Sequence, residues 1–165
     1  EGFNARFHSP HGLTFDSKGN LYIADTHNNC IRKLDTSEAV STMAGNSLTM
    51  NDFQFPVGVA FNPQGELFIS NKGNHKILKM NTFKDISVLT GTQKGFKNGN
   101  KDTAKLDFPS QLCWALDGAL YVADTENASI RKVTMEGTVS MLCGNPPRSK
   151  VSSQKSYAPI PETQT

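Results

Sequence analysis

Long apolar runs and an excess of charge of one sign are both missing from this sequence. The longest apolar stretches, such as 21–24 and 120–123, are far shorter than the ~20 residues of a membrane helix. We therefore expect a soluble chain without membrane insertion. The 17 Lys and Arg residues nearly balance the 15 Asp and Glu residues, for a formal net charge of +2. This sequence lacks the concentrated basic charge typical of proteins that bind phosphate backbones.

Cysteines are few and unpaired. Cys30, Cys113 and Cys143 are odd in number and lack a close CxxC spacing, so they predict neither a disulfide framework nor a metal site. We expect buried or partly buried free thiols, a pattern that favours a reducing, intracellular compartment. The sequence begins at Glu1, without Met and without a basic-then-apolar leader, which we interpret as a fragment or a processed piece.

Catalytic signatures are missing as well. The sequence contains no Gly-x-Ser-x-Gly elbow, no phosphate-binding glycine loop and no His-Glu-x-x-His pair. The histidines do not recur in register: they are His8, His11, His27 and His75. They give no metal-ligand pattern, so we expect no enzyme activity and no cofactor. A metal-dependent lyase or hydrolase with its site in a central channel, involving His11, stays open as an alternative.

The sequence does contain an internal repeat, the feature that decides a fold of this kind. Three prolines, Pro10, Pro56 and Pro109, each stand nine residues before a glycine and fifteen before an Asp or Asn. Successive prolines are 46 and 53 residues apart (56−10 and 109−56). The longer spacing comes from an insertion around 94–103, which we interpret as a surface loop between repeats.

Each copy of the repeat offers four short extended segments. Apolar, partly alternating runs occupy 21–24, 67–70 and 120–123, then 31–34, 77–80 and 130–133, and finally 40–45, 86–91 and 139–144. Runs of this length and pattern are typical of β-strands. Four strands per copy match the size of one blade of a β-propeller.

The Pro-x-Gly, Gly-Asn-Leu-Tyr-Ile-Ala-Asp-Thr-x-Asn and Ile-Arg-Lys segments of residues 10–33 resemble the NHL repeat. The resemblance covers about 5–144. It implies an all-β partial propeller with three four-stranded antiparallel blades, at approximately 5–45, 53–91 and 106–144, of a six-bladed ring. Residues 145–165 are rich in Pro and Ser and predict a disordered tail or linker.

Half a ring leaves two apolar faces between blades uncovered. We therefore expect either further blades in a longer chain or a homodimer that closes the ring. The matching residues Phe7, Phe53 and Leu106 are predicted to pack between neighbouring blades. Gln111 replaces the glycine of the other copies, and Trp114 departs from their Phe pattern, so we expect a distorted first strand in the third copy.

Polar residues after the second strand of each copy are predicted to be structural. They are expected to bond to the amides of their own turn, and they are Asp25, Asn28, Asn71, Asn74, Asp124 and Asn127. Basic residues recur on the third strand, where we expect one solvated face that serves as a binding surface. These are Arg32, Lys33, Lys76, Lys79, Arg131 and Lys132.

The function that these patterns favour is a propeller scaffold or recognition module that binds a protein partner. RNA binding through the basic residues, together with the 94–105 loop, is a further alternative. It is weakened by the small net charge and by our expectation that the aromatic residues face the core.

Overall fold

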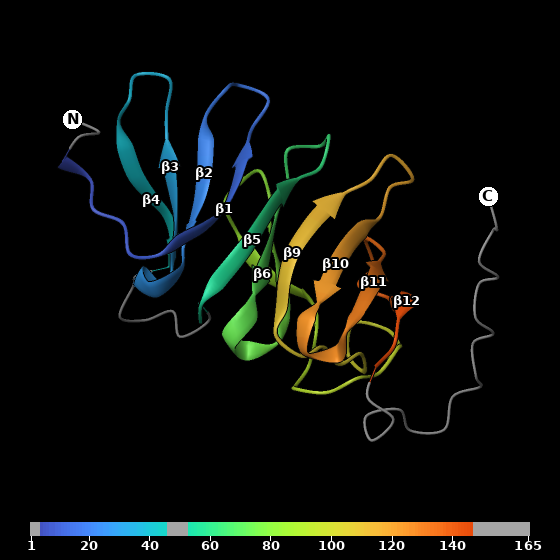
Figure 1. Cartoon of the computed structure of the whole chain (residues 1–165). Coiled ribbons are helices and arrows are strands. Elements are labelled where there is room, and N and C mark those ends of the chain that lie inside the picture. Colours follow the sequence, from blue (N-terminus) through green and yellow to red (C-terminus); the bar gives the residue numbers. More distant parts are fainter. Residues whose placement is uncertain (1–3, 46–52, 147–165) are drawn as a thin grey trace, which may run out of the picture.

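The computed structural model describes residues 4–45 and 53–146. This part of the chain folds into three four-stranded antiparallel sheets, in which the strands follow one another in sequence order. Figure 1 shows the three sheets standing side by side, as the resemblance implied. We number them blades 1, 2 and 3. The predicted tail falls almost entirely on residues outside this description.

The strand bounds are as follows. Blade 1 contains β1 (Pro10–Phe15), β2 (Leu21–Asp25), β3 (Cys30–Leu34) and β4 (Val40–Gly45). Blade 2 contains β5 (Pro56–Phe61), β6 (Leu67–Asn71), β7 (Lys76–Met80) and β8 (Ile86–Thr90). Blade 3 contains β9 (Pro109–Trp114), β10 (Leu120–Asp124), β11 (Ser129–Val133) and β12 (Val139–Gly144). One 3-10 turn follows the second strand of each blade: η2 (Thr26–Asn28), η3 (Lys72–Asn74) and η4 (Thr125–Asn127).

The first hairpin of each blade is fixed by local chemistry. In blade 1 the Asp16 carboxylate accepts the N–H groups of Lys18 and Asn20, both at 2.9 Å. Gly19 adopts a φ of +82°, which a residue without Cβ reaches at little cost. The turn therefore sets the register in which Phe15 pairs with Leu21.

The inner strands of neighbouring blades approach each other closely. β1 lies against β5, and β5 lies against β9. A Cβ on Gly12 would overlap the carbonyl oxygen of Val57, and a Cβ on Gly58 would overlap that of Ser110. Glycine is needed at both positions because the adjacent backbone occupies the space of a side chain.

The core lies between the blades rather than within them. One cluster, which includes Phe53, joins blades 1 and 2, and a second, which includes Leu106, joins blades 2 and 3. Phe53 is 5% exposed and Leu106 is fully buried, so the predicted packing between blades is confirmed for both. Phe7, the matching residue of blade 1, is 39% exposed because none of the three described blades covers it, and the predicted packing is wrong for this residue.

The expected distortion of β9 is wrong. Trp114 pairs with Leu120, as Phe15 pairs with Leu21 and Phe61 with Leu67. The tryptophan is thus in register and replaces phenylalanine at the same position. Its ring stacks on Phe68 of blade 2, with centroids 5.2 Å apart.

The cysteines are free, and they differ in exposure. Cys30 is buried, where burial raises the pKa of its thiol. The expectation of buried or partly buried thiols is wrong for Cys113 and Cys143, which are exposed. Both lie on the side of blade 3 that faces away from blade 2, where neither of the other two described sheets packs. Among residues 4–45 and 53–146, no helix has the length and apolar character needed to cross a membrane.

Candidate binding face

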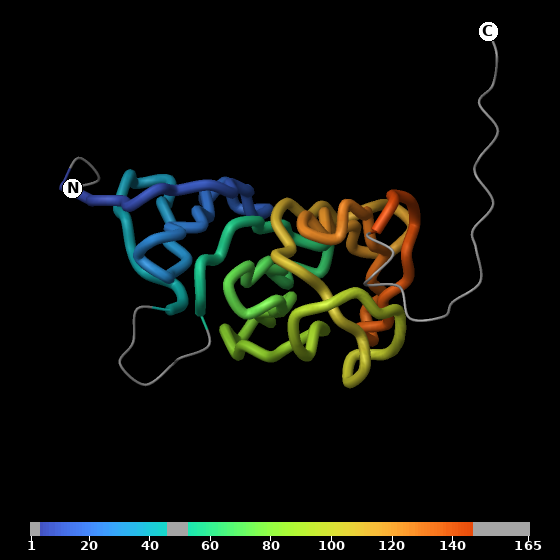
Figure 2. Tube along the Cα trace, turned by 60° about the horizontal axis from the view of Figure 1, so that its bottom comes forward, coloured from blue at the N-terminus to red at the C-terminus, as the bar shows by residue number. Residues whose placement is uncertain are grey.

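One end of the three blades gathers the polar connections. The turns η2, η3 and η4 lie there together with the segments that enter β1, β5 and β9, at the lower side of Figure 1. We call this end the η face. Figure 2 brings it forward and shows the 92–108 connector lying alongside blade 3.

A side-chain oxygen at the end of each second strand accepts a hydrogen bond from the segment that leads into the first strand of the same blade. Asp25 accepts the N–H of His8, and Asn71 accepts that of Gln54, each at 2.7 Å. In blade 3, Asp124 accepts the Asp107 N–H at 2.7 Å. The predicted bonds to the turn's own amides are therefore replaced by bonds to a segment seventeen residues away. A carboxylate and an amide serve equally because each offers an acceptor oxygen.

The asparagines of the turns support these acceptors where the structure describes their bonds. Asn28 Nδ2 donates to Asp25 Oδ2 at 2.8 Å, and Asn127 Nδ2 donates to Asp124 Oδ2 at 2.7 Å. Asn74 occupies the matching position at the end of η3. All three belong to the scaffold of the η face.

The acidic residue is paired with an arginine seven positions later. Arg131 Nη1 lies 2.6 Å from Asp124 Oδ2, with both side chains fully buried, and Arg32 Nη1 lies 3.7 Å from Asp25 Oδ2. Blade 2 has Leu78 at this position, beside the neutral Asn71. Charge and counter-charge thus appear together or not at all, because an unpaired buried charge is costly.

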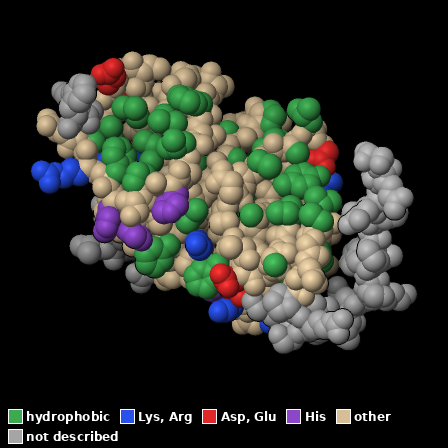
Figure 3. Space-filling view, in the orientation of Figure 1, with side chains coloured by type: hydrophobic (Ala, Val, Ile, Leu, Met, Phe, Trp, Pro, Cys, Tyr) green, Lys and Arg blue, Asp and Glu red, His purple; other side chains and the backbone are tan. Residues whose placement is uncertain are grey.

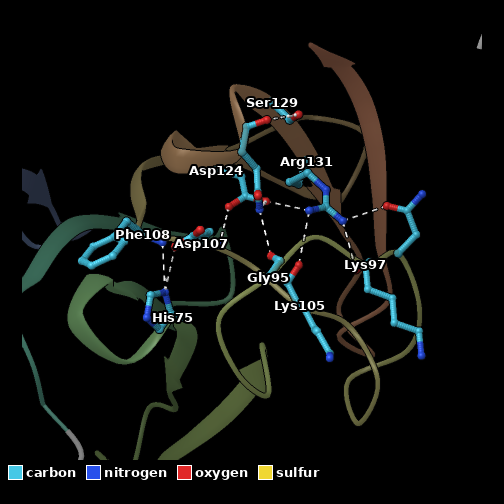
Figure 4. Close-up of polar contacts among 11 residues, drawn as sticks. His75, Gly95, Lys97, Lys105, Asp107, Phe108, Asp124, Ser129 and Arg131 are labelled. Atoms are coloured by element: carbon cyan, nitrogen blue, oxygen red, sulfur yellow. Dashed lines mark hydrogen bonds and ion pairs between the residues drawn. The ribbon is translucent and has the colours of Figure 1, made fainter. Parts of the chain in front are cut away.

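Arg131 also fixes the insertion that precedes blade 3. Figure 4 shows its guanidinium between Asp124 and the connector. It donates to the carbonyl of Lys97 at 3.1 Å and to Asn98 Oδ1 at 2.7 Å, and it lies 4.5 Å from the centroid of the Phe96 ring. The 94–103 insertion is therefore held against blade 3 through a buried cation.

The prediction of one basic face on the third strands is wrong. Successive residues of a strand point to opposite sides of the sheet, so Arg32 and Arg131 lie on the side opposite to Lys33, Lys79 and Lys132. The two arginines are taken up by buried or half-buried ion pairs. Two of the lysines form ion pairs with acidic residues of the hairpin between the first and second strands. Lys79 Nζ lies 3.2 Å from Glu66, and Lys132 Nζ lies 2.7 Å from Asp117.

Besides Arg131, Lys76 is a member of the predicted set that lies beside the insertion. It lines an open hollow of about 340 Å³ together with Thr92, Lys101 and Asp102. Lys101 is already paired with Asp102 at 2.8 Å. Of the basic residues expected to group with the 94–105 loop, this open hollow brings together Lys76 and Lys101.

Aromatic and imidazole rings occupy the η face over the junction of blades 1 and 2. The ring of His27 lies between those of His8 and Phe55, at centroid distances of 4.7 and 5.7 Å. Phe55 is 48% exposed. Figure 3 shows the histidines gathered on this side of the molecule.

A second aromatic group lies over the junction of blades 2 and 3. The ring of Phe108 packs edge-on against His75, with centroids 4.7 Å apart. Lys72 and Lys94 place their ammonium groups 5.9 and 5.6 Å from its centroid, within the range of a cation–π contact.

Sequence reasoning missed these phenylalanines and placed the aromatic residues in the core. Phe55 and Phe108 both directly precede the proline that begins an inner strand. Both adopt positive φ, 49° and 51°, which turns the side chain away from the core. The signal in the sequence was the phenylalanine directly before two of the three prolines, outside the alternation of the strand.

The His11 side chain makes hydrogen-bond contacts within blade 1. Its Nδ1 lies 2.9 Å from the carbonyl oxygen of Ser9 and 3.0 Å from Thr26 Oγ1. Among the residues that the structure describes, no three His, Cys, Asp or Glu side chains are grouped as metal ligands. The geometry gives no support for a metal site at His11.

His75 holds blade 3 to blade 2 as a neutral imidazole. Its Nδ1 accepts the N–H of Phe108 at 3.1 Å and lies at a longer 3.5 Å from Asp107 Oδ1. Accepting that N–H requires Nδ1 to be unprotonated. Burial, aided by Lys94, lowers the pKa of His75, and this outweighs the opposing effect of Asp107.

Acid should therefore weaken the junction of blades 2 and 3. Because the folded-state pKa of His75 is lowered, the unfolded chain takes up the proton first, so stability is complete above about pH 6.5 and falls as the pH drops toward the folded-state pKa. We expect His75→Asn, which copies Asn29 of blade 1, to keep the hydrogen bond and to remove this pH dependence. Urea unfolding at pH 7.5 and pH 5.5 measures the difference, on the order of 1 kcal/mol. An equal loss in wild type and variant would contradict the assignment.

The sheets, with their inner strands side by side and their core between them, define a partial β-propeller. Residues 7–34 and 53–80 match the family model of the NHL repeat. The chain thus carries NHL repeats in blades 1 and 2, as its sequence resemblance predicted. Blade 3 repeats their strand order, their turn and their acceptor residue.

Comparison with known proteins agrees with this fold. Protein SUPPRESSOR OF QUENCHING 1, chloroplastic, of Arabidopsis thaliana is 43% identical over 53 residues, which are 31% of this chain and 5% of that protein. A protein of unknown function from Bacteroides thetaiotaomicron superposes with a TM-score of 0.68 at 19% identity, over 89% of this chain and 38% of that one.

Enzymes are among the similar structures. A gluconolactonase from Xanthomonas campestris superposes with a TM-score of 0.65 at 16% identity, over 85% of this chain and 48% of that one. A streptogramin B lyase superposes with a TM-score of 0.51 at 17% identity, over 84% and 55%. At such identities the likeness shows the fold alone. The chain spans about half the length of these enzymes or less.

Proposed function

We propose that this chain is a recognition module whose η face binds a protein segment that is acidic and carries an aromatic residue. The observation that supports this most is the pair of groups around Phe55 and Phe108. Each presents a ring on the surface, beside a histidine or a lysine. Partly exposed aromatic side chains are typical of the anchor residues of interfaces, and beside Phe108 the ammonium groups of Lys72 and Lys94 favour an acidic partner.

The backbone of the η face is held by hydrogen bonds, which lowers the entropy cost of binding. The segments that enter the blades are held by Asp25, Asn71 and Asp124, as described above. The backbone also contributes, since Lys72 N donates to the Phe55 carbonyl at 3.2 Å. A partner therefore meets side chains whose backbone is ordered before binding.

Charge favours a protein over a nucleic acid. The η face gains its basic character from Lys72 and Lys94, while Arg131 is buried in an ion pair. With a formal net charge of +2, the chain has little to offer a phosphate backbone beyond these groups. Acidic side chains and one aromatic ring would complement the same surface.

Binding of labelled peptides tests the proposal. We would measure fluorescence anisotropy with a set of twelve-residue peptides, each rich in Asp and Glu and carrying one Trp or Phe, and with a poly(U) RNA of the same length. We expect micromolar or tighter binding of peptides. The double variant Phe55→Ala/Phe108→Ala should weaken it by at least roughly 30-fold, since the loss of even one anchor residue costs about 2 kcal/mol.

The matched control is Phe83→Ala. Phe83 is 85% exposed and lies in the hairpin between β7 and β8, at the other end of the blade. This variant should bind peptides as wild type does. Equal loss in both variants would contradict a role of the η face, and salt-sensitive binding of poly(U) in place of peptides would identify RNA as the ligand.

A further inference from the structure

The contact between blades 1 and 2 and the contact between blades 2 and 3 share three structural features. These features define what the uncovered side of blade 1 can bind. Each blade has an outgoing face, turned toward the next blade, and an incoming face, turned toward the blade before it. Blade 2 uses both faces. Among residues 4–45 and 53–146, no other sheet packs on the incoming face of blade 1 or on the outgoing face of blade 3.

The first feature is a glycine on the outgoing inner strand. Gly12 admits the Val57 carbonyl, and Gly58 admits the Ser110 carbonyl, each at a place that a Cβ would fill. The carbonyl belongs in each case to the residue after the first proline of the next blade. His11 is the matching residue on the incoming face of blade 1.

The second feature is an acceptor side chain at the left-handed residue after the 3-10 turn. Asn29 Oδ1 accepts the Phe55 N–H at 2.8 Å, and His75 Nδ1 accepts the Phe108 N–H at 3.1 Å. The donor is the residue before the first proline of the next blade. In blade 1 this residue is Ser9, which is exposed and has the same positive φ, 51°.

The third feature is an aromatic pair across the contact. Tyr22 packs edge-on against Phe61 with centroids 4.9 Å apart, and Phe68 stacks on Trp114 at 5.2 Å. The matching incoming ring of blade 1 is Phe15, which is 65% exposed.

The incoming face of blade 1 therefore carries all three groups that blades 2 and 3 present to the preceding blade: the His11 carbonyl, the Ser9 N–H and the Phe15 ring. Beside Phe15 it also exposes Leu13, at 58%, and Phe7, at 39%. Val59 and Phe53, which match these two residues in blade 2, are 2% and 5% exposed against blade 1. Figure 3 shows the resulting apolar patch over blade 1.

The outgoing face of blade 3 lacks two of the three features. Gln111 stands where Gly12 and Gly58 admit a carbonyl, and Ala128 stands where Asn29 and His75 accept an N–H. Ala128 keeps the left-handed backbone, with φ of 46°, but ends in a methyl group. Its aromatic residue, Tyr121, is retained and bonds to Asp117 at 2.8 Å.

We infer that the incoming face of blade 1 binds a further propeller blade that carries glycine and an acceptor at these two positions, and that blade 3 of a second copy is excluded. The Gln111 side chain would meet the His11 backbone, and the Ser9 N–H would face a methyl group. The contact is thus directional, and it uses a surface separate from the η face. The inference does not depend on the peptide-binding proposal.

Converting blade 3 tests this directly. The double variant Gln111→Gly/Ala128→Asn supplies both missing features at exposed positions, and Asn tolerates the left-handed backbone. Sedimentation equilibrium should show the wild type associating weakly, and the double variant associating at least roughly tenfold more strongly, because it regains a hydrogen bond and loses a clash.

Two further variants keep the test falsifiable. Adding Phe15→Asp to the double variant should abolish the gained association, because that change blocks the incoming face at an exposed position. Phe15→Asp in the wild-type background should leave weak association unchanged. The inference fails if wild type already associates as tightly through a contact that Phe15→Asp removes. It also fails if the double variant, folded by circular dichroism, associates no more than wild type.

Discussion

Replacing Arg131 with leucine should lower the free energy of unfolding by about 3–5 kcal/mol, because it leaves a buried carboxylate without its counter-ion. Asp124 and Arg131 are both fully buried, 2.6 Å apart. Burial already raises the pKa of Asp124 against the lowering effects of the Asp107 N–H, Asn127 and Arg131. Without the guanidinium, the carboxylate keeps the desolvation cost and loses the opposite charge that is paired with it.

The double variant Asp124→Asn/Arg131→Leu should be far less affected. It reproduces the pair of Asn71 and Leu78 in blade 2, where an amide accepts the segment's N–H without any charge. We expect it to recover about half or more of the loss of Arg131→Leu, since a neutral replacement of a buried pair is often tolerated. The bonds to the 94–103 insertion are not recovered, so some loss should remain.

Urea unfolding of wild type, both single variants and the double variant gives the coupling energy as a double-mutant cycle. Additive losses would show that the two side chains stabilise blade 3 independently. That result would contradict the interpretation that the charged pair and the neutral pair are alternative solutions for one position of the blade.

Truncating Phe53 to alanine should cost about 3–5 kcal/mol, the usual range for a buried phenylalanine. Its ring is 5% exposed and belongs to the cluster between blades 1 and 2. The cavity would lie between two sheets whose inner strands are already in close contact, so we expect little collapse to fill it.

Phe7→Ala is the matched control, because the same residue type holds the same position of blade 1. Its ring is 39% exposed and lies 5.6 Å from the guanidinium of Arg32. The expected loss is under about 1 kcal/mol, the value of an exposed cation–π contact. Thermal unfolding of both variants measures the contrast. Similar losses would show that the incoming face of blade 1 is covered in solution.

The three copies of the repeat determined the fold because they agree in the places that build a strand. The glycine before each second strand, the alternation within it and the proline before each inner strand predicted four strands per copy. Phe53 and Leu106 were predicted to pack between blades because they precede those prolines at a constant distance. These features are local or periodic, so the sequence displays them directly. The number of blades in the ring remains a prediction.

The candidate site was less visible in the sequence. Arg131 and Lys132 look alike as neighbours in a basic run, yet one is buried and the other pairs with a hairpin acid on the opposite side of the sheet. The alternation of a strand separates them, but which side is covered depends on the connector that folds over blade 3.

The sequence by itself therefore determined the blade: its strands and its turns. That the acceptor at the end of each second strand holds the segment entering the blade became visible only in the structure. The tertiary structure decided which matching residues of the repeat contribute equally to the free energy of unfolding. Phe7 and Phe53 hold the same place in the repeat and differ only in what lies against them. The physical reason is that a blade buries its apolar side chains and satisfies its backbone groups against its neighbours, so the neighbour sets the role of each residue.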